Sequence, residues 1–291
     1  MQYPREYQSN PRGSSVSEAD DNKLIEAILA SGVKIPPMPA ALLDVLALED
    51  NYAAGPREYA AAIGRDPPLA GAVFRVAGSP VMGARTKPES LEQAITVLGL
   101  RTTVAVARSE GLRGALRDPK LESLINTLWQ RMNAVADLVL ATVRIARLHG
   151  LREDLAFQAA IFHDCGVAIL CRRDPAYARG FGAIGAWPDL TALDAAYHTD
   201  HAVVGLMVAR NWQLPLDVAQ AIRQHHATHP ETLPESVRAL SVLVQFACHL
   251  LAQRSRADDS EWENVWKVHA EVLFHHASMG LAGLEERLLG P

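Results

Sequence analysis

Residues 160–166 read Ala160-Ile161-Phe162-His163-Asp164-Cys165-Gly166, an apolar run that ends in a histidine, an aspartate and a glycine. The run continues a helical pattern that begins near Asp154, because Phe157, Ile161 and Phe162 recur at helical spacing. An adjacent histidine and aspartate at the end of a helix can direct a ring nitrogen and a carboxylate to one divalent metal ion. The stretch therefore predicts a helix that carries polar chemistry at its C-terminal end.

The rest of the chain shows the same helical patterning. Alternating apolar and polar runs, which are typical of strands, are almost absent, and alanine and leucine, both good helix formers, are abundant. Asp66-Pro67 is a strong helix start, and Ser90-Leu91-Glu92-Gln93 has the spacing of a capping box. A long helix is predicted over about residues 121–149, and the glycine that follows this stretch marks its end. The fold class predicted from these signals is all-α.

Local punctuation divides the chain into three parts. Residues 1–21 are rich in polar residues and lack an apolar segment, so we expect a flexible tail, with Asp21 capping the first helix. Asp118-Pro119 interrupts the helical pattern and is the best candidate for a boundary. We therefore expect an N-terminal helical region over 22–117 and a second helical region over 118–291, which ends in a C-terminal helical extension.

Composition restricts the classes of function. The chain has 291 residues, 49% of them hydrophobic, and a formal charge of −5. An acidic balance argues against binding to nucleic acid or to an anionic membrane surface, since both need dense positive charge. Three cysteines without regular spacing do not form a disulfide framework, and neither a secretory signal nor an uninterrupted apolar run of about 20 residues is present. We expect a soluble protein of the reducing cytoplasm.

The chain contains 11 histidines, and several of them form tight groups. Besides His163-Asp164, the candidates are His201, which opens a predicted helix, and His225-His226, which close another. Antiparallel helices return distant residues to one face, so these side chains could converge on an oxygen-activating metal site. The alternative is that each is a hydrogen-bonded structural histidine, and the residues alone leave both interpretations open.

These motifs resemble the HD superfamily of metal-dependent phosphohydrolases. The resemblance rests on four segments: His163-Asp164 followed by Gly166, then Asp200-His201-Ala202-Val203-Val204-Gly205, then Trp212-Gln213-Leu214-Pro215, and finally His225-His226.

The N-terminal half narrows the resemblance to the HDOD family, the HD-related output domain. The segments that carry it are Ile35-Pro36-Pro37-Met38-Pro39, Arg65-Asp66-Pro67-Pro68-Leu69-Ala70, and Ser90-Leu91-Glu92-Gln93-Ala94-Ile95 with Leu98-Gly99-Leu100. The resemblance implies an all-helical fold in two lobes, an N-terminal helical lobe and an HD-like lobe. It also implies a role in bacterial signal transduction, usually without catalysis.

By the same resemblance, two ligands of an active HD site are missing. The first histidine should fall within residues 128–133, where Arg131 or Met132 stands instead, and the final aspartate should fall within 245–249, where Cys248 occupies the expected position. Arg131 would repel a divalent cation, whereas an ion pair with Asp164 would close the bundle without a metal, and we favour this ion pair. The expected vestigial site comprises Arg131, Met132, His163, Asp164, His201, His225, His226 and Cys248.

The resulting expectation is a non-catalytic signalling module that acts through a partner protein or a small ligand. It needs no cofactor, has no catalytic residues, and binds neither nucleic acid nor membrane. The alternative is a residual metal-dependent phosphohydrolase that holds a divalent ion with His163, Asp164, His201 and His225, with Cys248 as an unusual soft ligand.

Overall fold

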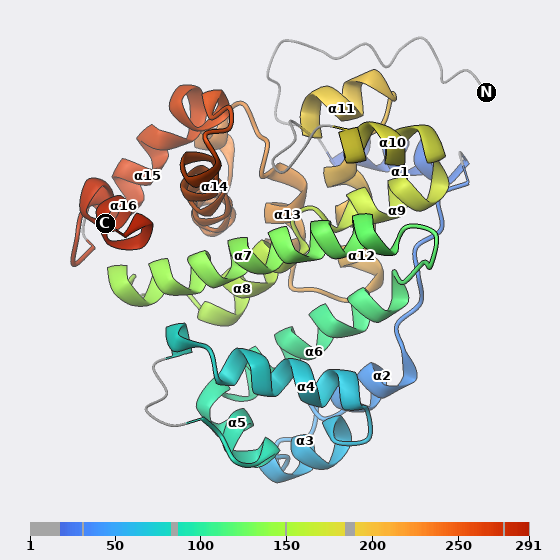
Figure 1. Ribbon diagram of the computed structural model, residues 1–291, viewed down its shortest axis with the longest axis vertical. Helices are drawn as coiled ribbons and strands as arrows, with labels where there is room; N and C mark the ends of the chain where they lie inside the picture. Colours follow the sequence, from blue (N-terminus) through green and yellow to red (C-terminus); the bar gives the residue numbers. More distant parts are fainter. Residues whose placement is uncertain are drawn as a thin grey trace.

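In this computed structural model the residues described are 18–30, 32–82, 87–148, 150–183, 190–275 and 277–290. Within these ranges the chain is helical and contains no strand, which confirms the all-α prediction (Figure 1). In chain order the helices are α1 (Glu18–Ala30), α2 (Ala40–Leu46), α3 (Pro56–Ile63), α4 (Pro67–Ala77), α5 (Leu91–Leu98), α6 (Leu100–Ala115), α7 (Glu122–Ala146), α8 (Glu153–Phe162), α9 (Cys165–Arg173), α10 (Pro175–Ala183), α11 (Leu190–Ala196), α12 (His201–Asn211), α13 (Leu216–Gln224), α14 (Glu235–Ser255), α15 (Lys267–Phe274) and α16 (Leu281–Leu289).

Short helical turns complete the list. Two are 3-10 turns, Pro80–Met82 and Pro230–Thr232, and Trp262–Trp266 is a π-helical turn that leads directly into α15. π-helical turns are rare and occur frequently at functional sites.

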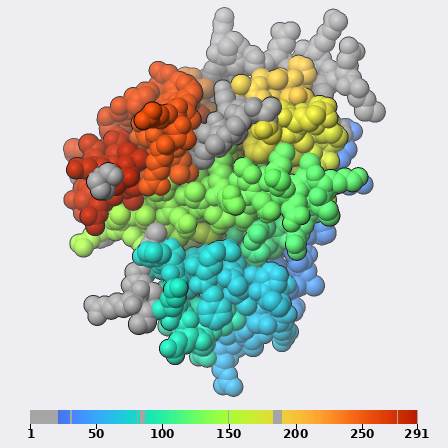
Figure 2. Space-filling view, in the orientation of Figure 1, coloured from blue at the N-terminus to red at the C-terminus, as the bar shows by residue number. Residues whose placement is uncertain are grey.

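Helix α7 runs across the middle of the molecule (Figure 1). Helices α2–α6 lie on one side of it, and α9–α16 lie mainly on the other (Figures 1 and 2). Helix α6 packs on α4 and also on α8, while α7 packs on α8 and α14. As a result, one hydrophobic core extends from Ile28 to Leu284.

Helix starts follow the local signals of the sequence. Asp66 caps α4 by accepting a hydrogen bond from the Leu69 amide at 3.0 Å, and Asp200 caps α12 in the same way. Ser90 caps α5 through the Gln93 amide at 3.1 Å. A side-chain cap satisfies an amide that would otherwise lack a helical partner, which is why these starts can be predicted from sequence.

The first helix begins earlier than predicted. Helix α1 starts at Glu18, so Asp21 lies within the helix rather than at its N-cap. Most of the expected tail, residues 1–17, lies outside the described residues.

Two helical stretches are long and apolar enough to cross a membrane. The first spans Glu153–Arg173, and its apolar window is 94% buried inside the fold. The second spans Glu235–Ser255, and its apolar window is 67% buried. Such burial is what a core helix of a globular protein also shows.

Candidate functional site

Three helix ends converge on Asp164. His163 and Asp164 lie between α8 and α9, His201 is the first residue of α12, and His225 follows α13 with His226 after it. Ligand atoms of Asp164, His201, His225 and His226 all lie within 4.8 Å of one another. The first three residues are buried and His226 is half-buried. The structure therefore brings the predicted histidines and aspartate together.

A close helix crossing makes this convergence possible. Helix α9 passes α12 at Gly166, where an added Cβ atom would lie 2.1 Å from the His201 carbonyl oxygen and 2.9 Å from the Gly205 amide nitrogen. An L side chain cannot occupy such a space without moving the backbone. The glycine that follows the His-Asp pair thus lets Asp164 approach His201.

Two of the histidine rings, those of His163 and His225, are held in orientation by a hydrogen bond from Nδ1, the ring nitrogen that faces away from Asp164. His163 Nδ1 donates to the Ala160 carbonyl at 2.6 Å, and His225 Nδ1 donates to the Ile222 carbonyl at 2.7 Å. Their Nε2 atoms consequently face Asp164, at 3.1 Å for His163 and 3.5 Å for His225. A ring fixed through one nitrogen presents the other to the site in a defined orientation.

Two carboxylates orient the remaining rings. Asp194 lies 2.6 Å from His201 Nδ1 and also accepts hydrogen bonds from the His201 amide and the Tyr177 hydroxyl. Glu261 lies 2.8 Å from His226 Nδ1. Sequence reasoning missed both residues, because contacts between residues seven and 35 positions apart, made through tertiary packing, leave no periodic signal.

Arg131 enters the site from α7. Its guanidinium Nη2 lies 3.2 Å from Asp164 Oδ2, and its side chain is 11% exposed. This confirms the predicted Arg131–Asp164 ion pair. Of the two residues considered for the missing histidine, Arg131 lines the cavity at the site, whereas Met132 is fully buried in the core.

The charges of the cluster are coupled. Burial opposes ionisation of Asp164, but its interactions with His163, Arg131 and His201 outweigh this effect and hold the pKa of the carboxyl well below its ordinary value. Burial likewise opposes protonation of His201, yet Asp194 and Asp164 raise the pKa of that imidazole to about 10. At neutral pH an ionised Asp164 therefore lies between two cations, Arg131 and His201.

His225 behaves in the opposite way. Burial, together with the positive charges of neighbouring histidines, lowers the pKa of His225 well below its ordinary value of 6.5. His225 is thus a neutral ring next to a charged one, with His201 Nε2 3.3 Å from His225 Nε2.

The free energy of unfolding is expected to fall as the pH rises from 6.5 to 8. The folded state keeps the His201 proton because its pKa is about 10, whereas the unfolded chain loses it near the ordinary value of about 6.5. The contribution is therefore complete below pH 6.5 and is lost toward pH 10, by at most about 1.4 kcal/mol per pH unit. Urea unfolding of the wild type and of His201→Asn across this window tests the prediction. Equal slopes for the two proteins would contradict it.

Cys248 stands on α14 at the wall of the same cavity. The cavity measures about 460 Å³ and is also lined by Arg131, Asp164, Gln245 and Glu261. Burial raises the pKa of the Cys248 thiol, and the carboxylates of Asp164 and Glu261 add to this effect. A neutral thiol is a poor metal ligand, because it is the thiolate that binds metal ions.

Solved structures of known proteins share this fold. A Shewanella amazonensis protein that is provisionally described as a metal-dependent phosphohydrolase superposes with a TM-score of 0.68 at 15% identity, covering 91% of this chain and 94% of that one. An HDOD domain protein of unknown function from Geobacter sulfurreducens gives 0.61 at 21% identity, covering 83% and 80%. A Marinobacter aquaeolei protein, provisionally described as a signal transduction protein, gives 0.59 at 18% identity, covering 85% and 60%.

No curated protein matches the chain in sequence. The family model of the HDOD domain matches residues 35–228. This range includes α2 to α13 and all the histidines of the cluster, whereas the supporting residues on α14 and after it lie outside the range. The chain belongs to the HDOD domain family.

Proposed function

We propose that the chain is a non-catalytic regulatory module of bacterial signal transduction, in which an ion pair replaces the metal ion of the HD site. The observation that carries the proposal is the position of the Arg131 guanidinium, 3.2 Å from Asp164 Oδ2. A fixed cation at this distance competes with a divalent ion for the same carboxylate and repels the ion.

The other groups around Asp164 support the same conclusion. His201 carries a proton on both ring nitrogens at neutral pH, since its pKa is about 10. A protonated imidazole has no lone pair for a metal ion. Cys248, in the place expected for the final aspartate, is a neutral thiol because burial raises its pKa. The residues present therefore fit a divalent metal ion poorly, and the module acts by binding a partner protein or a small ligand in the cytoplasm.

A second candidate function is a residual metal-dependent phosphohydrolase. It is favoured by the ligand atoms of Asp164, His201, His225 and His226, which lie within 4.8 Å of one another. In this alternative a metal ion would displace the His201 proton and the Arg131 side chain. The name of the Shewanella amazonensis protein is compatible with it.

Metal content and hydrolysis distinguish the two functions. The purified chain is incubated with excess Mn²⁺ or Fe²⁺, desalted and analysed for bound metal, and hydrolysis of bis(p-nitrophenyl) phosphate is followed with each ion. We expect less than one metal ion per ten chains and the same rate for the wild type and Asp164→Asn. One tightly bound ion per chain, with turnover that Asp164→Asn abolishes, would overturn the proposal and establish the phosphohydrolase.

A further inference from the structure

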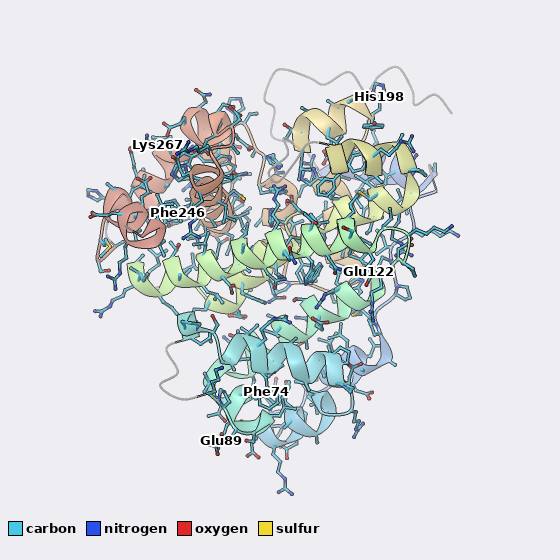
Figure 3. All side chains as sticks on the ribbon, viewed as in Figure 1. Phe74, Glu89, Glu122, His198, Phe246 and Lys267 are labelled. Carbon is cyan, nitrogen blue, oxygen red and sulfur yellow. The ribbon has the colours of Figure 1, made fainter. Side chains whose placement is uncertain are left out.

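A second cavity lies apart from the one at the histidine cluster. It measures about 1190 Å³, and its walls come from α4, the C-terminal half of α6, the first turns of α7 and the segment Pro36–Pro39. The described residues that line it include none of those lining the cavity at Asp164. Figure 3 shows Glu122, one of its wall residues, where α7 begins above α6.

The wall formed by Pro36–Pro39 is held in place by a hydrogen bond from Trp212. The Trp212 indole nitrogen, at the end of α12, donates to the Pro36 carbonyl at 2.9 Å, and Trp212 is fully buried. Prolines also restrict the backbone of the segment, so this wall is stiff. The cavity is therefore built from fixed elements.

Four acidic residues line the cavity: Asp66, Glu110, Asp118 and Glu122. Asp66 caps α4, and Asp118 accepts from the Lys120 amide at 2.9 Å and lies 4.0 Å from Arg172. Glu110 is buried: its side chain is only 10% exposed, its Oε2 makes no hydrogen bond, and its charged neighbours Arg75 and Arg113 form loose ion pairs with it. A buried carboxylate oxygen without a hydrogen bond is costly, and the two nearby guanidinium groups offset part of that cost.

The basic groups of the cavity are only loosely paired. Arg75 and Arg113 flank Glu110 at 3.8 and 3.6 Å, which are distances of loose ion pairs rather than hydrogen bonds. Arg117 follows the C-terminal end of α6, four residues after Arg113, and lines the same space. None of the three guanidinium groups makes a hydrogen bond to the part of the chain that the structure describes.

Two helical glycines leave the walls open. A Cβ atom at Gly71 in α4 or at Gly114 in α6 would meet no atom within 4 Å. Glycine in a helix costs about 0.5–1 kcal/mol relative to alanine, so neither position is explained by packing. Both residues line the cavity, and together they keep its walls free of side chains.

We propose that this cavity binds a nucleotide-sized organic phosphate, with its phosphate groups held by Arg75, Arg113 and Arg117. Guanidinium groups bind phosphate oxygens bidentately, which uses the donors that are free here. Glu110 acts as a positioning residue that holds Arg75 and Arg113 on the cavity wall. The ring system of the ligand packs on the apolar wall formed by Met38, Pro68, Leu69 and Ile125.

The size of the cavity supports this class of ligand. Its volume exceeds the usual range of small-molecule pockets, about 300–1,000 Å³, so a bare inorganic anion would leave it largely empty. The inference rests on the proposed regulatory function, for which it supplies the signal that the module senses.

Calorimetric titration tests the proposal on the full chain. The probes are ADP, GDP, CDP and UDP at low salt, each compared with its uncharged nucleoside. We expect at least one diphosphate to bind at one site per chain, with its nucleoside about tenfold weaker or worse. The double variant Arg113→Gln/Arg117→Gln should lose at least about tenfold in affinity, because the exposed arginines hold the phosphates.

Two glycine variants separate binding from folding. Gly114→Leu fills the cavity at a helical position and should abolish binding, whereas Gly182→Leu on α10, where a Cβ atom also meets nothing within 4 Å, should leave binding unchanged. If no diphosphate binds, or if nucleosides bind equally well, the inference is wrong. It is also wrong if the arginine or Gly114 variants keep the wild-type affinity.

The two proposals fail independently. Bound metal and turnover at Asp164 would overturn the regulatory function whatever the cavity binds. A metal-free, inactive chain that binds none of the four diphosphates would overturn only the inference about the cavity.

Discussion

Replacing Arg131 with methionine is expected to lower the free energy of unfolding by about 3 kcal/mol. Removing one partner of a buried ion pair leaves an uncompensated charge, which costs about 3–5 kcal/mol. Asp164 is fully buried, and Arg131 is one of the two strongest influences that keep it ionised. The lower end of the range applies because His201 remains 3.4 Å from Asp164. Urea unfolding at pH 7 measures the change.

Arg144→Met is the matched control for this substitution. Arg144 lies on the same helix and pairs with Glu153 at 2.7 Å, but both side chains are partly exposed. Solvent screening limits such a pair to about 0–1 kcal/mol. The double variant Arg131→Met/Asp164→Asn should recover part of the loss, since it removes the unpaired charge. If Arg131→Met costs no more than Arg144→Met, the ion pair does not hold the site together.

The fold could be predicted from sequence wherever its causes are local. Asp66, Ser90 and Asp200 cap helices through contacts within three residues, and helical periodicity marks most of the segments between them. The predicted start of α1 was wrong, because Asp21 resembles an N-cap residue. Nothing in the sequence excludes the earlier start at Glu18 that the structure shows. Local signals fix the type of an element better than its ends.

The site was predictable only in part. The Arg131–Asp164 pair could be predicted because the resemblance supplied the two positions and their opposite charges supplied the interaction. Asp194 and Glu261 could not, because tertiary packing rather than spacing brings them to the histidine rings. The cavity at Glu110 is likewise a product of packing, since its walls combine segments from residue 36 to residue 126.

The double substitution Arg131→His/Cys248→Asp is expected to create a metal-binding site. Arg131 and Cys248 both line the cavity at Asp164, so an imidazole and a carboxylate placed there would join the existing cluster. The change also removes the cation that repels a divalent ion. Binding to the folded state alone should then stabilise the variant by about 2.7 kcal/mol when Mn²⁺ is 100-fold above its Kd. Thermal unfolding with Mn²⁺ and with a chelator measures this difference, together with the metal content per chain.

The wild type should show no such stabilisation, because its Asp164 is already neutralised by Arg131 at 3.2 Å. Adding Asp164→Asn to the double variant should abolish the effect of Mn²⁺, since the amide cannot replace the central carboxylate as a charged ligand. An equal Mn²⁺ effect in the wild type would mean that Arg131 yields to a metal ion, and the phosphohydrolase alternative would then hold. No effect in the double variant would mean that these two positions do not face a common ion, although both line one cavity of about 460 Å³. The two comparisons therefore separate the loss of ligands from the loss of the site itself.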